Sequence, residues 1–389
     1  MSEIKVNSIK GVAASTAALT INNTDGTATA NLTNRQNRNL IINGAMQVAQ
    51  RGTSATNSGY GTVDRFRVQY SGTDEAPTQE QVDVASGTTP YTLGFRKALR
   101  ITNGNQTSGA GTSDAVHFQY YAESQDIANS GWNYLSSSSF VTLSFWIKSS
   151  VAQNFQGRVR TRDGTSQNYA FETGSLSADT WTKITKTIPG NSNLQFDNNT
   201  EKNLQTDIFA FLGTDDTSSA VSLDTWATYA SGTQVKDVTS TWYTTNDATL
   251  EITGVQLEVG SVATDFEFRS YSDEFQKCLR YYEQMSSNGV SVAYFATGYC
   301  ESTTEANYPI LFKVYKRATP TVTSTAGSTF RNHHTGTSVD CSNIVFNLAT
   351  PMSCRAQTVA SSAVLGDGNA ACLAAHSSTE ALIKIDAEL

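Results

Sequence analysis

The sequence predicts an all-β protein: two β-sandwich domains joined by one short helix, with an extended segment at the N-terminus. Three observations lead to this prediction. Apolar and polar residues alternate with period two along most of the chain, and turns rich in Gly, Ser, Asn and Asp separate these runs. Charged residues make up only 16% of the chain, so its polarity comes from Ser, Thr, Asn, Gln and Gly, which is typical of strands joined by polar turns. One stretch alone, 271–285, has a clear helical period.

Residues 1–38 are small and polar, and they hold too few apolar side chains to fold alone. The alternation Leu19-Thr20-Ile21 suggests strand fragments. Either the segment is a disordered leader, or neighbouring copies of the chain or another protein order it. Its content of Thr, Val and Ile favours ordering on assembly, and it lacks the charge of a typical disordered tail. Three copies side by side would share the burial, so we expect a parallel homotrimer.

Residues 39–270 have the densest period-two signal and are expected to form the larger sandwich. In each predicted strand the apolar residues share one phase, which should face the core. These apolar phases are Phe66, Val68 and Tyr70; Val116, Phe118 and Tyr120; Val141, Leu143, Phe145 and Ile147; and Phe155, Val159 and Thr161. The opposite, polar phases are Arg65, Arg67 and Gln69; His117, Gln119 and Tyr121; Thr142, Ser144, Trp146 and Lys148; and Arg158, Arg160 and Arg162. One more strand is predicted at 208–212.

The stretch 250–259 changes its phase at Gly254. Leu250 and Ile252 hold one phase, whereas Val255, Leu257 and Val259 hold the other. A bulge or corner at Gly254 would restore a single buried face.

The predicted helix, 271–285, lies in a linker, 271–286, between the two β domains. Ser270 and Asp273 form an N-terminal cap pattern. Its apolar residues recur at positions i, i+3, i+4 and i+7: Phe275, Cys278, Leu279 and Tyr282. The run 286–289 (SSNG) should end the helix.

Residues 287–389 are expected to form the smaller sandwich, since about 100 residues suffice for one. Strands are predicted at 290–296, 310–316 and 344–348. The last residues, 383–389, alternate to the end of the chain, so we expect a terminal strand inside a sheet.

The net charge of −8 and the pI near 5.1 argue against a nucleic-acid-binding protein, which should show a basic stripe. An acidic surface gives no general attraction to anionic membranes. No apolar run approaches the roughly 18–20 residues that span a bilayer. The opening MSEIKVNSIK has no apolar core of a secretory signal, so we expect the protein to be made and folded in a cytoplasm.

Metal and cofactor signals are weak, and no cofactor is expected. The chain has five cysteines and no C-x-x-C pair, which favours free and mostly buried thiols. A zinc site could be built from His333, His334, Cys341 and Cys354, but their spacing matches no common zinc motif. The turns Asp215-Asp216 and Asp163-Gly164 offer oxygen ligands for a structural calcium ion, although such acidic turns are more commonly turns alone.

Catalytic motifs are missing from the sequence: there is no G-x-S-x-G, P-loop, G-x-G-x-x-G or H-E-x-x-H. A glycosidase would need two carboxylates close together, which the sequence alone leaves open. The carboxylates that could meet are Asp64, Glu123, Asp126, Glu251 and Glu258. The chain also lacks the repeats of a parallel β-helix. We therefore expect no enzymatic activity.

Several stretches resemble tail-fibre and virion-surface proteins of tailed bacteriophages. Residues 4–9 (IKVNSI) are similar to the virion-attachment leaders of such fibres. Residues 143–148 (LSFWIK) and 252–260 (ITGVQLEVG) resemble jelly-roll strands of these proteins and of carbohydrate-binding modules. Further similar stretches are 39–46 (NLIINGAM), 50–52 (QRG), 60–66 (YGTVDRF), 280–283 (RYYE), 309–320 and 386–389 (DAEL).

This resemblance implies a jelly roll over 39–270, a homotrimer, and a place on the virion, with a tail fibre favoured over another position on the particle. It implies that residues 1–38 attach to another virion protein of the tail or an adaptor. It also implies attachment to a host surface polysaccharide or lipopolysaccharide. An N-terminal anchor would leave 287–389 farthest from the particle, so this tip domain is expected to make the main contact.

Sugars are held by aromatic faces and by planar polar groups that pair with hydroxyls. The polar face of the larger predicted sandwich offers such groups, and our candidate glycan-binding residues are Trp146, Tyr121, Arg158, Arg160 and Gln119, with Arg100 nearby. The alternatives stay open: Trp146 could pack under a loop or in a subunit interface, and the arginines could line a solvated sheet face. An adhesin is therefore the first hypothesis, a purely structural virion protein the second and a polysaccharide depolymerase the third.

Overall fold

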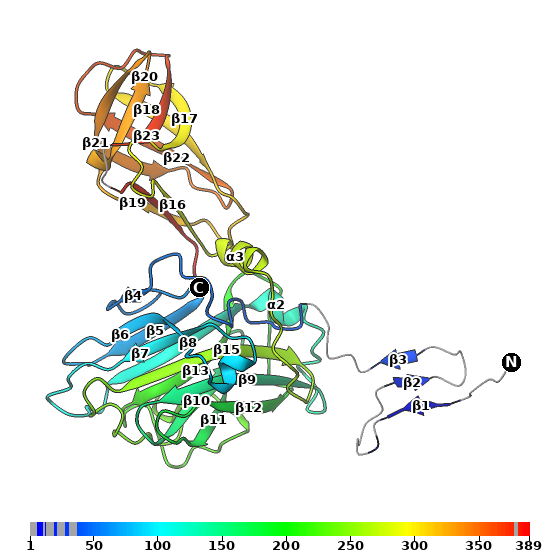
Figure 1. Ribbon diagram of the computed structural model, residues 1–389. Helices are drawn as coiled ribbons and strands as arrows, with labels where there is room; N and C mark the ends of the chain where they lie inside the picture. Colours follow the sequence, from blue (N-terminus) through cyan, green and yellow to red (C-terminus); the bar gives the residue numbers. More distant parts are fainter. Residues whose placement is uncertain (1–5, 11, 13–18, 22–27, 31–36, 377–379) are drawn as a thin grey trace.

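The computed structural model describes residues 6–10, 12, 19–21, 28–30, 37–376 and 380–389. It confirms the all-β class: two β domains lie one above the other, and helix α3 (Tyr271–Leu279) lies between them (Figure 1). The other helical elements are short: α1 (Thr89–Thr92), α2 (Ser124–Ala128), η1 (Ser231–Thr233) and η2 (Gly327–Thr329). Within the described residues, no helix is both long enough and apolar enough to span a membrane.

The larger domain is a jelly-roll sandwich of two six-stranded antiparallel sheets, which we call the β8 sheet and the β9 sheet. The β8 sheet consists, in spatial order, of β14 (Trp226–Thr228), β11 (Gln167–Ser175), β10 (Asn154–Arg160), β13 (Lys202–Leu212), β8 (Ala115–Glu123) and β5 (Phe66–Ser71). The β9 sheet consists of β12 (Thr182–Pro189), β9 (Phe140–Ser149), β15 (Thr249–Val259), β7 (Lys97–Thr102), β6 (Thr78–Asp83) and β4 (Ser54–Ala55).

The core of the larger domain lies between the inward faces of the two sheets, as the period-two alternation predicts. Val116, Phe118 and Tyr120 of β8 are buried there, and so is the predicted apolar phase of β9. The predicted strand at 208–212 is the second half of β13.

The predicted bulge at Gly254 is confirmed. The register between β15 and β9 shifts between Thr253 and Gln256, and Gly254 has a φ of +63°. A Cβ atom at Gly254 would lie only 2.6 Å from the Phe95 ring, so both the backbone and the packing favour glycine. The bulge turns Leu250 and Leu257 toward the same core.

Helix α3 begins as predicted and ends six residues early. The Ser270 hydroxyl accepts a hydrogen bond from the Asp273 amide at 3.2 Å. The prediction of helix to residue 285 is wrong, because Tyr282–Ser286 forms strand β16 and pairs with β24 (Leu382–Asp386). A partner strand so distant in the sequence leaves no local signal in the helical period.

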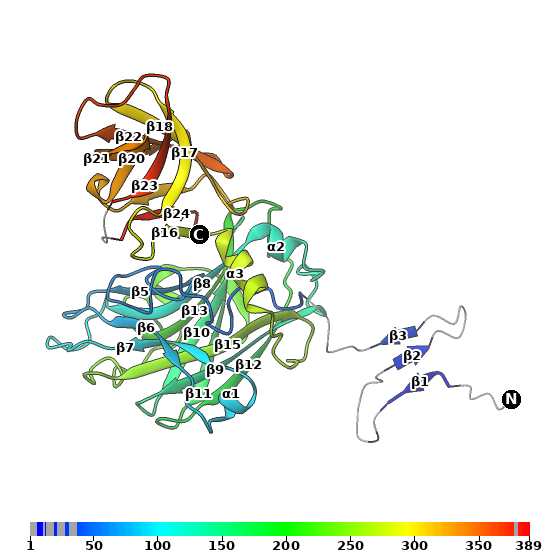
Figure 2. The same cartoon turned by 45° about the horizontal axis from the view of Figure 1, so that its top comes forward.

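The C-terminal domain combines a three-stranded sheet with a barrel. The sheet has the order β16-β24-β19, so the predicted terminal strand lies at its centre, with Ile383 and Ile385 fully buried. Where the sequence predicts a small sandwich, six strands close into a barrel on the side of this sheet away from the larger domain (Figure 1, Figure 2). The barrel strands are β17 (Tyr294–Cys300), β18 (Glu305–Leu311), β20 (Phe330–His334), β21 (Thr337–Asn347), β22 (Ser353–Ala360) and β23 (Ala370–Ala375), whereas β19 (Thr321–Ser324) belongs to the three-stranded sheet.

Two predicted strands of this domain are displaced. The strand predicted at 290–296 begins at Tyr294, and the strand predicted at 310–316 ends at Leu311. Residues 312–316 instead leave the barrel and place Lys316 against Glu283 at the base of the domain. The strand predicted at 344–348 lies within β21, apart from its last residue.

The N-terminal segment contains a small antiparallel sheet of β1 (Ser8–Ile9), β2 (Leu19–Ile21) and β3 (Ala28–Ala30) (Figure 1). The strand fragment predicted at 19–21 is thus confirmed. Much of the predicted leader, including 1–5 and 31–36, lies outside the described residues.

Candidate functional site

The outer face of the β8 sheet brings together four of the five predicted glycan-binding residues. In one row across the strands, Gln119 lies opposite Asp207, which lies opposite Arg158. In the next row, Tyr121 and Arg160 lie on either side of Gln205. The structure therefore places these four residues on one face of one sheet.

Gln119 and Arg158 are nevertheless buried, which corrects the expectation that they face solvent. Both bind the buried carboxylate of Asp207: Gln119 donates at 2.9 Å and the Nε of Arg158 at 2.5 Å. Gln205 donates to the same carboxylate at 2.7 Å. Burial raises the pKa of Asp207, but Arg158, His117 and Gln119 outweigh it and hold that pKa below its ordinary value. Gln119 and Arg158 thus hold the strands together, leaving little of either for a ligand.

Segment 213–240, which includes β14 and η1, covers this half of the face. Gln234 accepts a hydrogen bond from Arg158, and Val235 packs with Phe209 on the outside of the sheet. Tyr229 lies over the Arg160 guanidinium, with 3.4 Å between the Arg160 Cζ and the ring centroid. Little in the sequence marks this cover, because its residues lie in turns and one short strand.

His117 lies in the covered half and makes the fold sensitive to acid. Burial lowers the pKa of His117 from 6.5 to about 4. The unfolded chain therefore takes up this proton near pH 6.5, whereas the folded chain does so only near pH 4. Stability should fall by about 3 kcal/mol as the pH falls through this window.

Replacing His117 by Gln removes this titration, so we expect the advantage of the wild-type protein over the variant to shrink from pH 7 to pH 4. Urea unfolding of both proteins at several pH values measures the difference. Asp64, whose pKa burial raises to about 6, acts in the opposite direction in both proteins and cancels. Parallel pH profiles would contradict the assignment to His117.

The other half of the outer face carries a cluster of cations, which we call the basic face: Arg67, Arg162 and Lys202 lie around Tyr121, and Arg160 lies at the edge of the cluster beneath Tyr229. The Tyr121 ring centroid lies 5.9 Å from the Cζ of both Arg67 and Arg162 and 5.3 Å from the Lys202 Nζ. Within the described part of the chain, no carboxylate oxygen lies within 4.0 Å of a charged nitrogen of these four residues. Burial, Arg162 and Arg67 lower the pKa of Lys202. The arrangement suits an anion.

Tyr121 itself is 5% exposed, so it supports this face from below and offers little surface. Its ring packs with Leu389 and Tyr281. The prediction that Tyr121 lies on a solvated sheet face is therefore wrong. Sequence reasoning did not select Arg67, Arg162 or Lys202 as site residues. One sequence signal could have found this cluster. Arginines occupy every second position at 65 and 67 and again at 158, 160 and 162, which is unusual in a chain of net charge −8.

Trp146 lies on the other sheet, so it cannot share a site with Tyr121. It is half-buried on the outside of the β9 sheet, where it packs in a small apolar cluster with Phe95, Ala98 and Phe266. This packing agrees with the alternative that the sequence left open, in which Trp146 packs under a loop. Arg100, on the same sheet, pairs with Glu80 at 2.7 Å.

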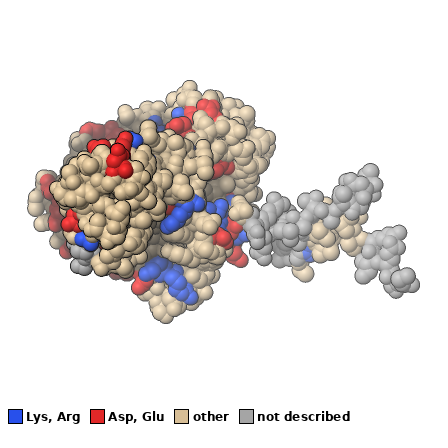
Figure 3. All heavy atoms as spheres, turned by 90° about the horizontal axis from the view of Figure 1, so that it is seen from above, with Lys and Arg blue, Asp and Glu red and all other residues tan. Residues whose placement is uncertain are grey.

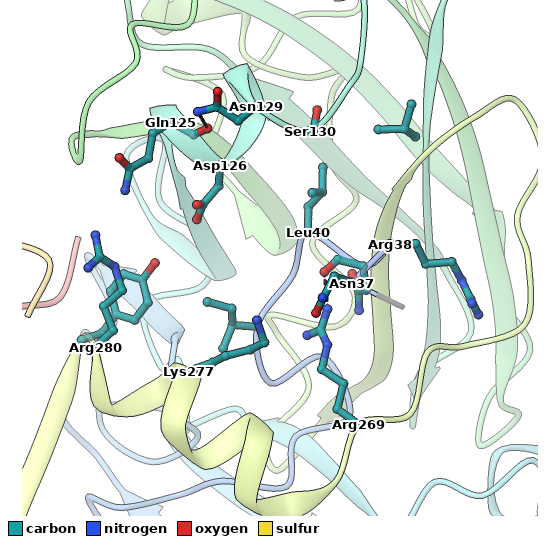
Figure 4. A pocket seen from close by; sticks show the side chains of 14 residues that line it. Asn37, Arg38, Leu40, Gln125, Asp126, Asn129, Ser130, Arg269, Lys277 and Arg280 are labelled. Carbon is teal, nitrogen blue, oxygen red and sulfur yellow. Dashed lines mark hydrogen bonds between the residues drawn. The ribbon is translucent and has the colours of Figure 1, made fainter. Parts of the chain in front are cut away.

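A second candidate is a cleft of about 620 Å³ between α2, α3 and residues 37–42. Figure 4 shows Gln125, Asp126 and Asn129 on one side of this cleft and Lys277 and Arg280 on the other.

The cations of this cleft mostly have carboxylate partners. Arg280 binds Glu123 through two hydrogen bonds of 2.7 and 2.8 Å. Arg269 pairs with Glu267 at 3.1 Å and Arg38 with Glu258 at 3.6 Å. The charge of the cleft is therefore largely balanced, unlike that of the basic face.

The predicted carboxylates do not gather in one place. Asp64 accepts hydrogen bonds from Gln50, Glu251 pairs with Lys148 at 3.0 Å, and Glu258 binds Thr264 at 2.6 Å. Glu123 and Asp126 do lie near one another, and burial together with Glu123 raises the pKa of Asp126.

The acidic turns considered for calcium take part in hydrogen bonds within the protein. Among the described residues, no group of three or more His, Cys, Asp or Glu side chains is placed to hold a metal ion. Asp163 accepts from Ser124 at 2.6 Å and from the Asp197 amide at 2.8 Å, and Asp216 accepts from Gln234. All five cysteines lie in the described part of the chain and are free, as expected, and four of them are buried.

Comparison with known proteins yields structural neighbours only. No family model matches the sequence, and no curated protein matches it. A CBM4 carbohydrate-binding module shares 13% identity, with a TM-score of 0.29 over 57% of this chain and 99% of that one. A family 30 carbohydrate-binding module shares 12%, with a TM-score of 0.26 over 60% and 91%. The enzymatically active domain of bacteriophage CBA120 tailspike protein 4 shares 10%, with a TM-score of 0.29 over 57% of this chain and 22% of that one.

Proposed function

We propose that this chain is a non-enzymatic adhesin, a virion-surface protein of the tail-fibre type that binds a glycan on the host cell. The observation that carries the proposal is the basic face, where Arg67, Arg162 and Lys202 surround Tyr121, Arg160 lies at the edge, and none of the four has a carboxylate partner among the described residues. Tyr60 and Tyr229, both half-buried, flank it: their ring centroids lie 5.4 Å from the Arg67 Cζ and 3.4 Å from the Arg160 Cζ. Guanidinium groups pair with sugar hydroxyls, and the rings add apolar surface against which sugars stack.

The proposal includes a homotrimer whose residues 1–38 attach to a tail or adaptor protein of the virion. The leader-like sequence of this segment supports the attachment. Exposed apolar side chains at one end of the barrel, Leu311, Leu348 and Met352, offer a surface that another copy could cover. Three weak sites on one trimer would raise the apparent affinity by roughly 10²–10⁴ where geometry permits.

The expectation that 287–389 makes the main contact stays a prediction. One observation favours a second glycan contact there: Tyr294 and Tyr299 on β17 are 64% and 51% exposed. Exposed tyrosine rings are suited to stack on sugars.

Retention of the full chain on immobilised bacterial polysaccharides and lipopolysaccharides tests the function. We expect at least one preparation to retain the protein, periodate oxidation of that glycan to abolish retention, and no reducing ends to be released. Failure to bind any preparation would favour the structural alternative. Release of reducing ends would establish a depolymerase instead.

A further inference from the structure

Resting on the proposed glycan binding, we infer that the ligand is an acidic polysaccharide whose sugars bear carboxylate groups, held on the basic face by Arg67, Arg162 and Lys202.

The charge distribution is the first support. The chain has a net charge of −8, yet its cations are not spread evenly: Figure 3 shows Lys and Arg gathered in patches beside the C-terminal domain. In the cleft beside α3, Arg38, Arg269 and Arg280 have carboxylate partners. On the basic face the like charges repel one another without such relief, so a bound anion would remove the repulsion.

The unused hydrogen-bond donors are the second support. The Nη2 of Arg67 donates to Gln69 at 2.6 Å and the Nη1 of Arg162 to Gln205 at 2.9 Å, so neutral amides hold these two side chains in place. Each guanidinium keeps further N–H groups, and its planar fork matches a carboxylate.

The strands that supply the cations suit an anionic group repeated along a polymer. Arg67 comes from β5, Lys202 from β13, and Arg162 follows the end of β10. Strands β5 and β10 are three strand spacings apart, roughly 14 Å. Side chains that approach from both directions can each meet a carboxylate when successive sugars of one polymer carry them. The flanking rings of Tyr60 and Tyr229 then meet the sugars between the charges.

The test compares homogalacturonan and alginate with their methyl-esterified forms, in which the backbone is kept and the charge removed. Binding of the full chain is measured by calorimetry. We expect the charged forms to bind at least tenfold more tightly and this advantage to shrink as NaCl rises, because salt screens exposed charges. Poly(glycerol phosphate) serves as the phosphate arm and should bind more weakly than the polyuronates.

Arg162→Gln and Lys202→Gln should each weaken polyuronate binding by roughly five- to tenfold, since each removes one charge-assisted contact. Lys183→Gln is the matched control: Lys183 is exposed on the β9 sheet and removing it changes the net charge equally, so binding should not change. Unaltered melting temperatures would show that all three variants fold.

The outcomes separate this inference from the function beneath it. Equal binding of charged and esterified forms, a preference for poly(glycerol phosphate), or equal effects of the site variants and Lys183→Gln would each overturn the acidic ligand. The acidic ligand would also be overturned if polyuronates failed to bind the protein while immobilised bacterial glycans retained it. If the protein bound no glycan at all, neither the polyuronates nor the bacterial polysaccharide and lipopolysaccharide preparations, the proposed function would be overturned as well.

Discussion

Replacing Glu388 by Gln should lower the free energy of unfolding by about 3–5 kcal/mol and loosen the joint between the two domains. Glu388 is almost fully buried and pairs with the fully buried Arg65 and with Arg51 of the larger domain. These guanidinium groups lie over tyrosine rings of the C-terminal domain: the Arg65 Cζ is 3.4 Å from the Tyr281 centroid and the Arg51 Cζ 3.6 Å from that of Tyr282. A neutral amide in place of the Glu388 carboxylate would leave a buried positive charge without its counter-charge.

Urea unfolding measures this loss, and small-angle scattering would report larger separations between the domains. Asp386→Asn is the matched control. Asp386 also pairs with Arg51, at 3.2 Å, but its side chain is 46% exposed, so its loss should cost about 1 kcal/mol or less. Equal effects of the two variants would show that burial of the Glu388 pair is not what stabilises the joint.

The joint also supports the basic face. Arg65 donates a hydrogen bond of 2.6 Å to the carbonyl of Tyr121, and Tyr60 donates one of 3.1 Å to the Leu389 carbonyl. The fold therefore couples the position of the C-terminal domain to the strand that carries Tyr121.

Replacing Lys316 by Met should likewise lower the free energy of unfolding by about 3–5 kcal/mol, because it leaves the buried Glu283 carboxylate without its partner. Both side chains are fully buried, and the Lys316 Nζ lies 2.6 Å from Glu283 and 2.6 Å from the Leu279 carbonyl. Burial lowers the pKa of Lys316, and Glu283 opposes this effect. The pair links the end of α3, strand β16 and the segment after β18.

The double variant Lys316→Met/Glu283→Leu provides the control. It replaces both charges by apolar groups of similar volume, so much of the stability should return. Thermal and urea unfolding of the single and double variants measure the coupling. If the double variant were less stable than Lys316→Met alone, the desolvation argument for this pair would be wrong.

The sequence by itself determined the all-β class, most strands of the larger domain, the bulge at Gly254, the cap at Ser270 and the terminal strand. Each of these is a local property: alternation, a glycine at a phase change or a capping side chain can be recognised within about ten residues. It also placed Gln119, Tyr121, Arg158 and Arg160 on one face, because strands of alternating phase must turn their polar sides the same way.

Only the tertiary structure decided which of these polar side chains are exposed to solvent. Asp207 and the segment 213–240 bury Gln119 and Arg158, and the second sheet separates Trp146 from Tyr121. Strand β16 replaces the end of the predicted helix because β24, nearly a hundred residues later, supplies its hydrogen bonds. The basic face likewise exists because β5 and β13 pair with β8, and β10 pairs with β13. Strand pairing between distant segments obeys the whole fold rather than the local pattern, so it leaves no signal in any single stretch of the chain.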